Sequence, residues 1–130
     1  MHLYQNLLQQ FNDDAQLHPL SEYILHHNDP LYADYQLQIM RNNMIGNYCV
    51  YVTLPNNHPD VGKDYEEIDM DVHGGLSYGI HNKFGIDFGH LHDFNPEFLI
   101  PHPDPLMIVW TFDMVKEEGF KMIELFYERV

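Results

Sequence analysis

Hydrophobic residues recur at a helix-like spacing near both ends of the chain. The N-terminal set is Leu3, Leu7, Leu8 and Phe11, and the C-terminal set is Val115, Met122, Ile123 and Phe126. Spacings of three and four residues place such side chains on one face of a helix. We therefore predict an N-terminal helix that ends at the polar residues 12–14. A C-terminal helix should start at the cap residue Thr111 and pack on the rest of the protein.

The remainder of the first third predicts two more short helices. The first would begin near Pro19 or Ser21, a good N-cap, and stop by Asp29. Pro30 suits the first turn of the next helix, which would run to the end of this segment. Residues 1–43 are thus expected to form a helical N-terminal segment.

The character of the sequence changes at Gly46, and strands are predicted from there on. Residues 48–54 are β-branched and aromatic and lie between glycine and proline, which is typical of a strand. A second strand is predicted at residues 70–73, with a bulge or close backbone approach at Gly74-Gly75 before residues 76–80, and a third strand at residues 83–88. Four prolines between residues 95 and 105 predict an irregular surface loop, because each removes a backbone donor.

These elements predict an α+β fold. It would contain an antiparallel β-sheet of three or more strands packed by a C-terminal helix, with a helical N-terminal segment. We expect residues 1–43 and 44–130 to form two parts of one compact unit. A chain of 130 residues with 45% hydrophobic content is large enough to bury such a core.

The charge of the protein limits the partners it can bind. Twenty acidic residues against six basic ones give a formal net charge of −14. This charge opposes direct binding to nucleic acid, because phosphates are recognised by cationic side chains. It suits docking on a basic groove of another protein. A soluble acidic protein without such a partner is the alternative that the charge leaves open.

Cysteine content and hydropathy indicate the compartment. Cys49 is the only cysteine, so no internal disulfide is expected. The sequence shows neither a charged-then-apolar signal peptide nor an apolar run of membrane-spanning length. We therefore expect the protein in the cytoplasm.

Aspartate and histidine residues are concentrated in the stretch from residue 69 to residue 93. Imidazole and carboxylate groups are ligands that suit Zn²⁺ and other divalent first-row ions. Neighbouring strands would bring His73 beside the loop that contains Asp87, His90 and Asp93. The sequence therefore predicts a Zn²⁺ site whose ligands are His73, Asp87, His90 and Asp93.

Two alternatives remain open for this cluster, with His92 as a reserve ligand. In the first alternative no metal is bound, and the polar groups accept hydrogen bonds from backbone donors in the glycine-rich turns, which is a structural role. If a metal is bound, four ligands would make the site structural, whereas three ligands and a water would support hydrolysis. No catalytic residue is assigned, because Ser77 lacks a Gly-x-Ser-x-Gly elbow and Cys49 lies inside a predicted strand.

Several separated motifs resemble one family of small proteins from bacteriophages and prophages. They are Asn57-His58-Pro59, Gly62-Lys63-Asp64-Tyr65, Asp71-Val72-His73-Gly74-Gly75-Leu76-Ser77-Tyr78 and Gly85-Ile86-Asp87-x-x-His90-x-x-Asp93. The resemblance implies an α+β domain, a phage origin and a site that keeps the Asp and His positions together. The chain departs from the family pattern at His92 and in the proline-rich insertion after Phe94, so the ligand set stays open.

Small acidic phage proteins of this kind resemble inhibitors of host defence, including anti-CRISPR proteins that occupy the nucleic-acid groove of a nuclease. We therefore expect a phage-encoded inhibitor with a metal-organised scaffold that acts in the cytoplasm of the bacterial host cell. Its partner would be a nucleic-acid-handling effector, such as a Cas nuclease, bound through the acidic surface.

Four tyrosines in the first third are candidate anchors for that partner, or else they pack inside the protein: Tyr4, Tyr23, Tyr32 and Tyr35. The alternative functions are a metal-dependent hydrolase, a protein that sequesters a nucleotide signal, and a virion assembly protein. An enzyme is less favoured because the basic residues that offset phosphate charge are scarce.

Overall fold

Five strands form one antiparallel sheet with the order β1-β2-β3-β5-β4. The computed structural model describes residues 2–42, 46–90, 92–96 and 106–130. The described elements are, in chain order, α1 (His2–Leu17), β1 (Glu22–Leu25), the 3₁₀ turn η1 (Pro30–Tyr32), β2 (Gln36–Arg41), β3 (Tyr48–Thr53), the 3₁₀ turn η2 (Tyr65–Glu67), β4 (Tyr78–Ile80), β5 (Lys83–Asp87) and α2 (Phe112–Glu128). The predicted α+β class is confirmed.

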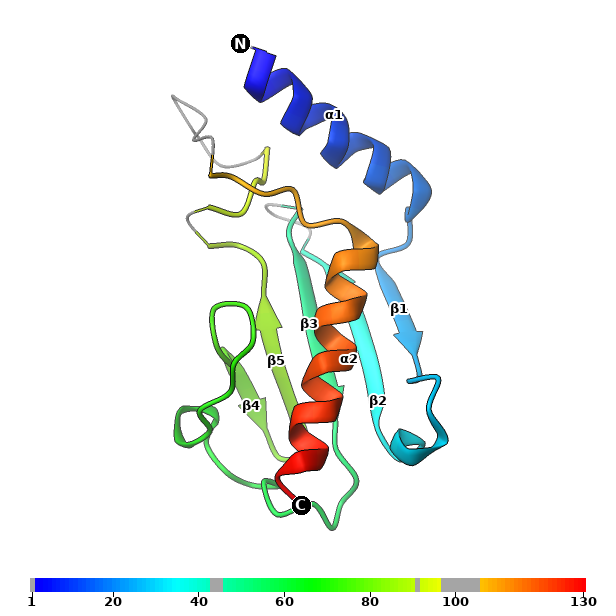
Figure 1. Cartoon of the computed structure of the whole chain (residues 1–130), viewed down its shortest axis with the longest axis vertical. Helices are drawn as coiled ribbons and strands as arrows, with labels where there is room; N and C mark the ends of the chain where they lie inside the picture. Colours follow the sequence, from blue (N-terminus) through cyan, green and yellow to red (C-terminus); the bar gives the residue numbers. More distant parts are fainter. Residues whose placement is uncertain (1, 43–45, 91, 97–105) are drawn as a thin grey trace.

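Helix α2 covers one face of the sheet, above β3 and β2 (Figure 1). The core forms between these two layers because side chains alternate along each strand. Val50 and Val52 of β3 point toward the helix and are fully buried, as is Val115 of α2. The helix comes so close that a Cβ atom at Gly119 would lie 2.5 Å from Leu37 Cδ1. A side chain at this position would have to displace the Leu37 side chain.

Residues 22–41 do not form the two predicted helices. Strands β1 and β2 pair with each other, with Tyr23 opposite Ile39, and β2 pairs with β3. The buried residues of β2 are Leu37 and Ile39, which are separated by one polar residue. That alternation has the period of a strand, and pairing with β3 decides the conformation. The prediction of a helical segment over residues 1–43 is therefore wrong beyond α1.

The helices differ from the prediction at their ends. Helix α1 continues through the polar residues 12–14 to Leu17, and Pro30 begins only a 3₁₀ turn. Helix α2 begins as predicted after Thr111, whose side chain accepts a hydrogen bond from the Met114 amide. Neither helix of the described part is long and apolar enough to cross a membrane.

Residues 70–73 pair with no strand, so the strand predicted there is wrong. The chain turns at this point instead, with the Val72 amide donating to the Met70 carbonyl at 2.9 Å and the Gly75 amide donating to the Val72 carbonyl at 2.8 Å. Ile68, Met70 and Val72 are buried in alternation with exposed aspartates. The alternating pattern therefore comes from packing against the core and not from a hydrogen-bonded ladder. The predicted proline-rich loop falls mostly on residues 97–105, which lie outside the described residues.

A buried carboxylate ties α1 to the start of α2. Asp14 is 7% exposed, and its Oδ1 accepts a hydrogen bond from the Phe112 amide at 2.8 Å. Its Oδ2 accepts one from the Tyr48 hydroxyl at 2.6 Å and one from Arg41 at 3.2 Å. Burial, followed by the hydrogen bond to Asp14, raises the pKa of Tyr48 above its usual range. The helix therefore passes through residues 12–14 because a tertiary contact satisfies Asp14.

A second buried group holds the end of α2. His58 Nε2 donates to the Phe126 carbonyl at 2.7 Å, and His58 Nδ1 accepts from the Asp60 amide at 3.0 Å. Asp60 is 1% exposed and accepts two hydrogen bonds from Arg129, at 2.6 and 3.0 Å, beside Lys63 Nζ at 3.0 Å. Burial alone would raise the pKa of Asp60, but the hydrogen bonds from Arg129 and Lys63 outweigh it and lower the pKa.

We expect Asp60→Asn to lower the free energy of unfolding by about 2–3 kcal/mol at neutral pH. The substitution removes the negative charge that pairs with Arg129 and Lys63. The contribution of the carboxylate is present above its unfolded-state pKa and is lost as the pH falls through the lowered folded-state pKa. Urea unfolding across this range should therefore show the two proteins converging in acid. The control Asp71→Asn, at an exposed position, should have little effect; equal losses would contradict this account.

Candidate metal centre

The candidate centre lies where β5 ends and the chain turns. Asp87 is the last residue of β5, and its Oδ1 accepts a hydrogen bond from the Gly89 amide at 3.1 Å. The turn that follows carries His90 and Asp93, and Asp93 bridges to Ile108 in the segment before α2. These residues meet the loop that precedes β4.

Three of the predicted ligand residues converge here. The donor atoms of His73, His90 and Asp93 all lie within 4.8 Å of one another. His73 Nε2 is 2.9 Å from Asp93 Oδ2, His90 Nδ1 is 3.1 Å from the same oxygen, and the two nitrogens are 3.3 Å apart. Bonds of about 2.1 Å to one ion would place neighbouring ligand atoms about 3.0 Å apart in octahedral geometry and about 3.4 Å apart in tetrahedral geometry. The triangle therefore has the size of one face of a metal polyhedron.

The carboxylate is the buried corner of this triangle. Asp93 is 3% exposed, and its Oδ2 also accepts a hydrogen bond from the His90 amide at 2.9 Å. Burial by itself would raise the pKa of Asp93, but hydrogen bonds from His73 and from the His90 amide and ring outweigh it and lower the pKa. Asp93 is therefore held as an anion that can bind a cation.

His73 is held by groups that the sequence did not single out. Its ring stacks on Phe88 at 4.9 Å with an interplanar angle of 8°, and it lies 4.5 Å from the Trp110 ring. Its backbone amide donates to Glu118 Oε1 of α2 at 2.9 Å. Helical spacing places Glu118 on α2, but nothing in the sequence indicates which loop it meets.

Glycine at position 74 makes room for the second histidine. A Cβ atom there would lie 2.4 Å from His90 Cε1 and 2.6 Å from His90 Nε2, and Gly74 has a φ of +69°. Gly75 also has a positive φ, of +73°, but nothing lies within 4 Å of its missing Cβ. The loop therefore rests directly on the His90 ring at one of its two glycines.

The other predicted residues lie around this group rather than in it. Asp87 Oδ1 is 3.5 Å from His90 Nε2, the ring nitrogen that faces away from Asp93. A carboxylate in this position orients a metal-binding imidazole through its second nitrogen. His92, the reserve ligand, has an exposed side chain and accepts a hydrogen bond from the Ile108 amide through its carbonyl.

The donor set determines what the arrangement can do. Two imidazoles and one carboxylate suit Zn²⁺ or another divalent first-row ion and leave at least one coordination position for water. The His73 and His90 side chains are 23% and 39% exposed, so solvent reaches that side. Burial and then the charge of Asp87 raise the pKa of the Cys49 thiol, which disfavours the reactive thiolate form. Comparisons with protein-family models, curated proteins and solved structures give no match for this chain.

The two neighbouring glycines give a matched test of the site. Both Gly74→Ala and Gly75→Ala place a side chain at positive φ, which costs about 1–2 kcal/mol. Only Gly74→Ala would also push a methyl group into the His90 ring. We expect it to lower the melting temperature further and to shift the His90 imidazole signals in NMR spectra, whereas Gly75→Ala should leave them in place. Identical effects of the two variants would contradict the contact.

Proposed function

We propose that the protein binds one divalent transition-metal ion, with Zn²⁺ as the expected ion, through His73, His90 and Asp93. The observation that carries this proposal is the triangle of donor atoms at 2.9, 3.1 and 3.3 Å. Asp87 acts as a positioning residue through His90 Nε2. Hydrogen bonding alone does not require both imidazoles to turn toward the same carboxylate oxygen.

An ion at this point joins segments that are distant in the sequence. His73 belongs to the loop before β4, and His90 and Asp93 belong to the turn after β5. Through the Glu118 hydrogen bond to His73, the same loop contacts α2. Binding free energy at such a site adds to the folding free energy, because the unfolded chain does not hold the ligands together. We therefore assign the ion a role in organising the fold.

Zinc titration should give one equivalent of bound ion and a higher melting temperature. His73→Ala, His90→Ala and Asp93→Asn should each weaken binding by at least about 100-fold, because each removes one of three ligands. Calorimetry measures the affinity, and His92→Ala is the matched control that should keep it. Failure of the wild-type protein to take up Zn²⁺, Mn²⁺, Fe²⁺ or Co²⁺ would sink the metal proposal.

On this scaffold we propose an inhibitor of bacterial defence that docks on a basic groove of a nucleic-acid-handling effector, such as a Cas nuclease. Its support is that each of the six basic side chains lies near a carboxylate or an aromatic ring of the same chain. Arg41 binds Asp14, Lys63 and Arg129 bind Asp60, Lys116 lies near Asp113, Lys121 lies near Glu118, and Lys83 lies over Tyr51. The excess of acidic residues is therefore what the protein presents to a partner.

One acidic region lies beside the end of α2. Asp69, Asp71 and Glu128 line a common open hollow there with Arg129. Glu66 is exposed in the preceding turn. An anionic surface of this kind speeds encounter with a basic partner and selects against acidic ones.

The four candidate tyrosine anchors make contacts inside the protein. Tyr35 is 3% exposed, and the Tyr23 ring lies 4.7 Å from Phe112. Tyr4 meets Phe94 at 5.8 Å, and Tyr32 meets Tyr127 at 5.3 Å. These contacts support internal packing of the tyrosines and leave the acidic surface as the basis for docking.

The engaged cations also weigh against the alternatives. A nucleotide-binding or phosphoester-cleaving site needs positive groups to offset phosphate charge. Arg41 and Arg129 each pair with a buried aspartate. We therefore rank a metal-dependent hydrolase and a nucleotide-sequestering protein below the inhibitor.

Affinity capture tests the inhibitor proposal. From lysates of bacteria that carry CRISPR or other defence systems, the protein should recover a nucleic-acid-handling effector, and binding should weaken as salt rises. The triple variant Glu66→Gln, Asp69→Asn and Asp71→Asn should bind less well than one with the same charge change elsewhere, Asp13→Asn, Glu22→Gln and Asp34→Asn. Recovery of no such effector, or equal binding by the two triple variants, would contradict it.

A further inference from the structure

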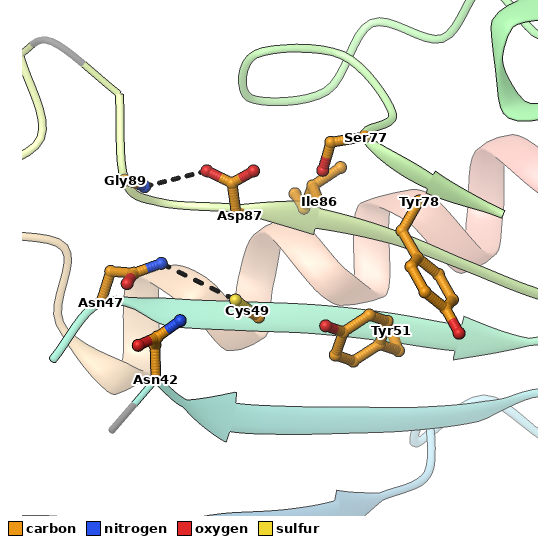
Figure 2. A pocket seen from close by; sticks show the side chains of 9 residues that line it. All are labelled: Asn42, Asn47, Cys49, Tyr51, Ser77, Tyr78, Ile86, Asp87 and Gly89. Atoms are coloured by element: carbon orange, nitrogen blue, oxygen red, sulfur yellow. Dashed lines mark hydrogen bonds between the residues drawn. The ribbon is translucent and has the colours of Figure 1, made fainter. Parts of the chain in front are cut away.

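A second hollow lies on the sheet face opposite α2. Its volume is about 360 Å³, and it is lined by Asn42, Asn47, Cys49, Tyr51, Ser77, Tyr78, Ile86, Asp87 and Gly89. Side chains alternate along β3, so Cys49 and Tyr51 face outward where Val50 and Val52 face the helix. Figure 2 shows these outward side chains in front of the sheet, with a helix behind it.

Two tyrosine rings stand at one end of this hollow, and a glycine in β5 sets the position of the first. Gly85 stands opposite Tyr51, and a Cβ atom on it would lie 2.5 Å from Tyr51 Cδ1. The Tyr51 ring therefore lies against the backbone of β5. The Tyr78 ring stands nearly upright beside it, with the centroids 5.1 Å apart and an interplanar angle of 78°. Together the two rings form an aromatic wall at one end of the pocket.

A carboxylate faces this wall from the other side. The Asp87 side chain is 37% exposed, and one of its oxygens accepts the hydrogen bond from Gly89. The other oxygen points away from Gly89, toward the Ser77 side of the pocket (Figure 2). Asn47 Oδ1, at the same end, is buried without a hydrogen-bond partner among the residues that the structure describes. The Asp87 carboxylate is therefore an exposed hydrogen-bond acceptor at this end of the pocket.

The chemistry of the lining favours a cation over an anion. Its side chains supply one carboxylate, two amides, hydroxyl groups, a thiol and two aromatic rings, and it contains no Lys or Arg. Lys83 Nζ already lies 4.8 Å from the centroid of the Tyr51 ring, so this ring accepts a cation from within the chain. The net charge of −14 adds to the attraction.

We propose that this pocket binds the guanidinium group of an arginine side chain carried by a protein partner. A planar guanidinium donates hydrogen bonds in parallel to a carboxylate and stacks on an aromatic ring, and the pocket offers both groups. An ammonium group lacks the planar fork, and an anion is repelled by Asp87. The statement that the arginine belongs to a partner protein rests on the proposed function. The binding of a guanidinium group does not depend on it.

The test uses isotope-labelled protein and two small amides, N-acetyl-arginine methylamide and its uncharged citrulline analogue. The arginine probe should shift the backbone amide NMR signals of Cys49, Tyr51, Asp87 and Gly89 saturably. Its affinity should exceed that of the citrulline probe by at least about tenfold, because the two differ mainly in charge. Spermidine should bind more weakly than the arginine probe. No saturable shift at these amides, or equal or tighter binding of either comparison compound, would overturn the assignment.

Variants separate this pocket from general attraction to an acidic protein. Asp87→Asn and Tyr78→Leu should each weaken arginine binding by at least about fivefold. Lys83→Gln should strengthen it by about twofold, because an internal cation is removed. Asp71→Asn, at an exposed position outside this pocket, should leave it unchanged. If Asp71→Asn weakens binding as much as Asp87→Asn, the attraction is non-specific and the pocket assignment fails.

The two proposals fail separately. The small-probe titration needs no partner protein, so saturable arginine binding without capture of an effector would retain the pocket and reject the inhibitor. Capture of an effector that Tyr78→Leu does not weaken would retain the inhibitor and reject the pocket as its docking point. Circular dichroism confirms that each variant is folded before it is used, and Tyr78→Leu keeps the test decisive if Asp87→Asn unfolds.

Discussion

The close packing of α2 on β3 and β2 is the constraint on which the other features depend. Gly119 lets the helix approach Leu37, and Tyr48, Val50 and Val52 on the inward face of β3 are buried. Because strand side chains alternate, the same packing directs Tyr51 and Asp87 to the opposite face. Buried polar contacts at both ends of the helix, from Asp14 to the Phe112 amide and from His58 to the Phe126 carbonyl, hold this arrangement.

Asp87 stands between the two candidate sites. Its Oδ1 is 3.5 Å from the His90 nitrogen that faces away from the metal triangle, and its side chain also lines the pocket on the open face. A cation bound in the pocket and an ion held by His73, His90 and Asp93 would therefore both depend on the orientation of one carboxylate.

The basic residues of the protein are few, and two of them pair with buried carboxylates. Arg41 and Arg129 each pair with a buried aspartate, at Asp14 and Asp60, which lie near opposite ends of α2. Pairing does not change the net charge, which is −14 because 20 acidic residues stand against six basic ones. Buried pairing of this kind contributes to one defined structure.

The sequence by itself determined the elements whose local signals are strong: the β-branched strand β3, the capped helix α2 and the grouping of His73, His90 and Asp93 near one turn. It did not determine β1 and β2, because Leu37 and Ile39 take their strand conformation from pairing with β3. Only the tertiary structure decided that Asp87 lies next to His90 Nε2, the ring nitrogen that faces away from Asp93. The same holds for the contacts of Glu118 and Trp110 with His73. These contacts join residues far apart in the chain, and no local spacing or propensity encodes which distant side chains will meet.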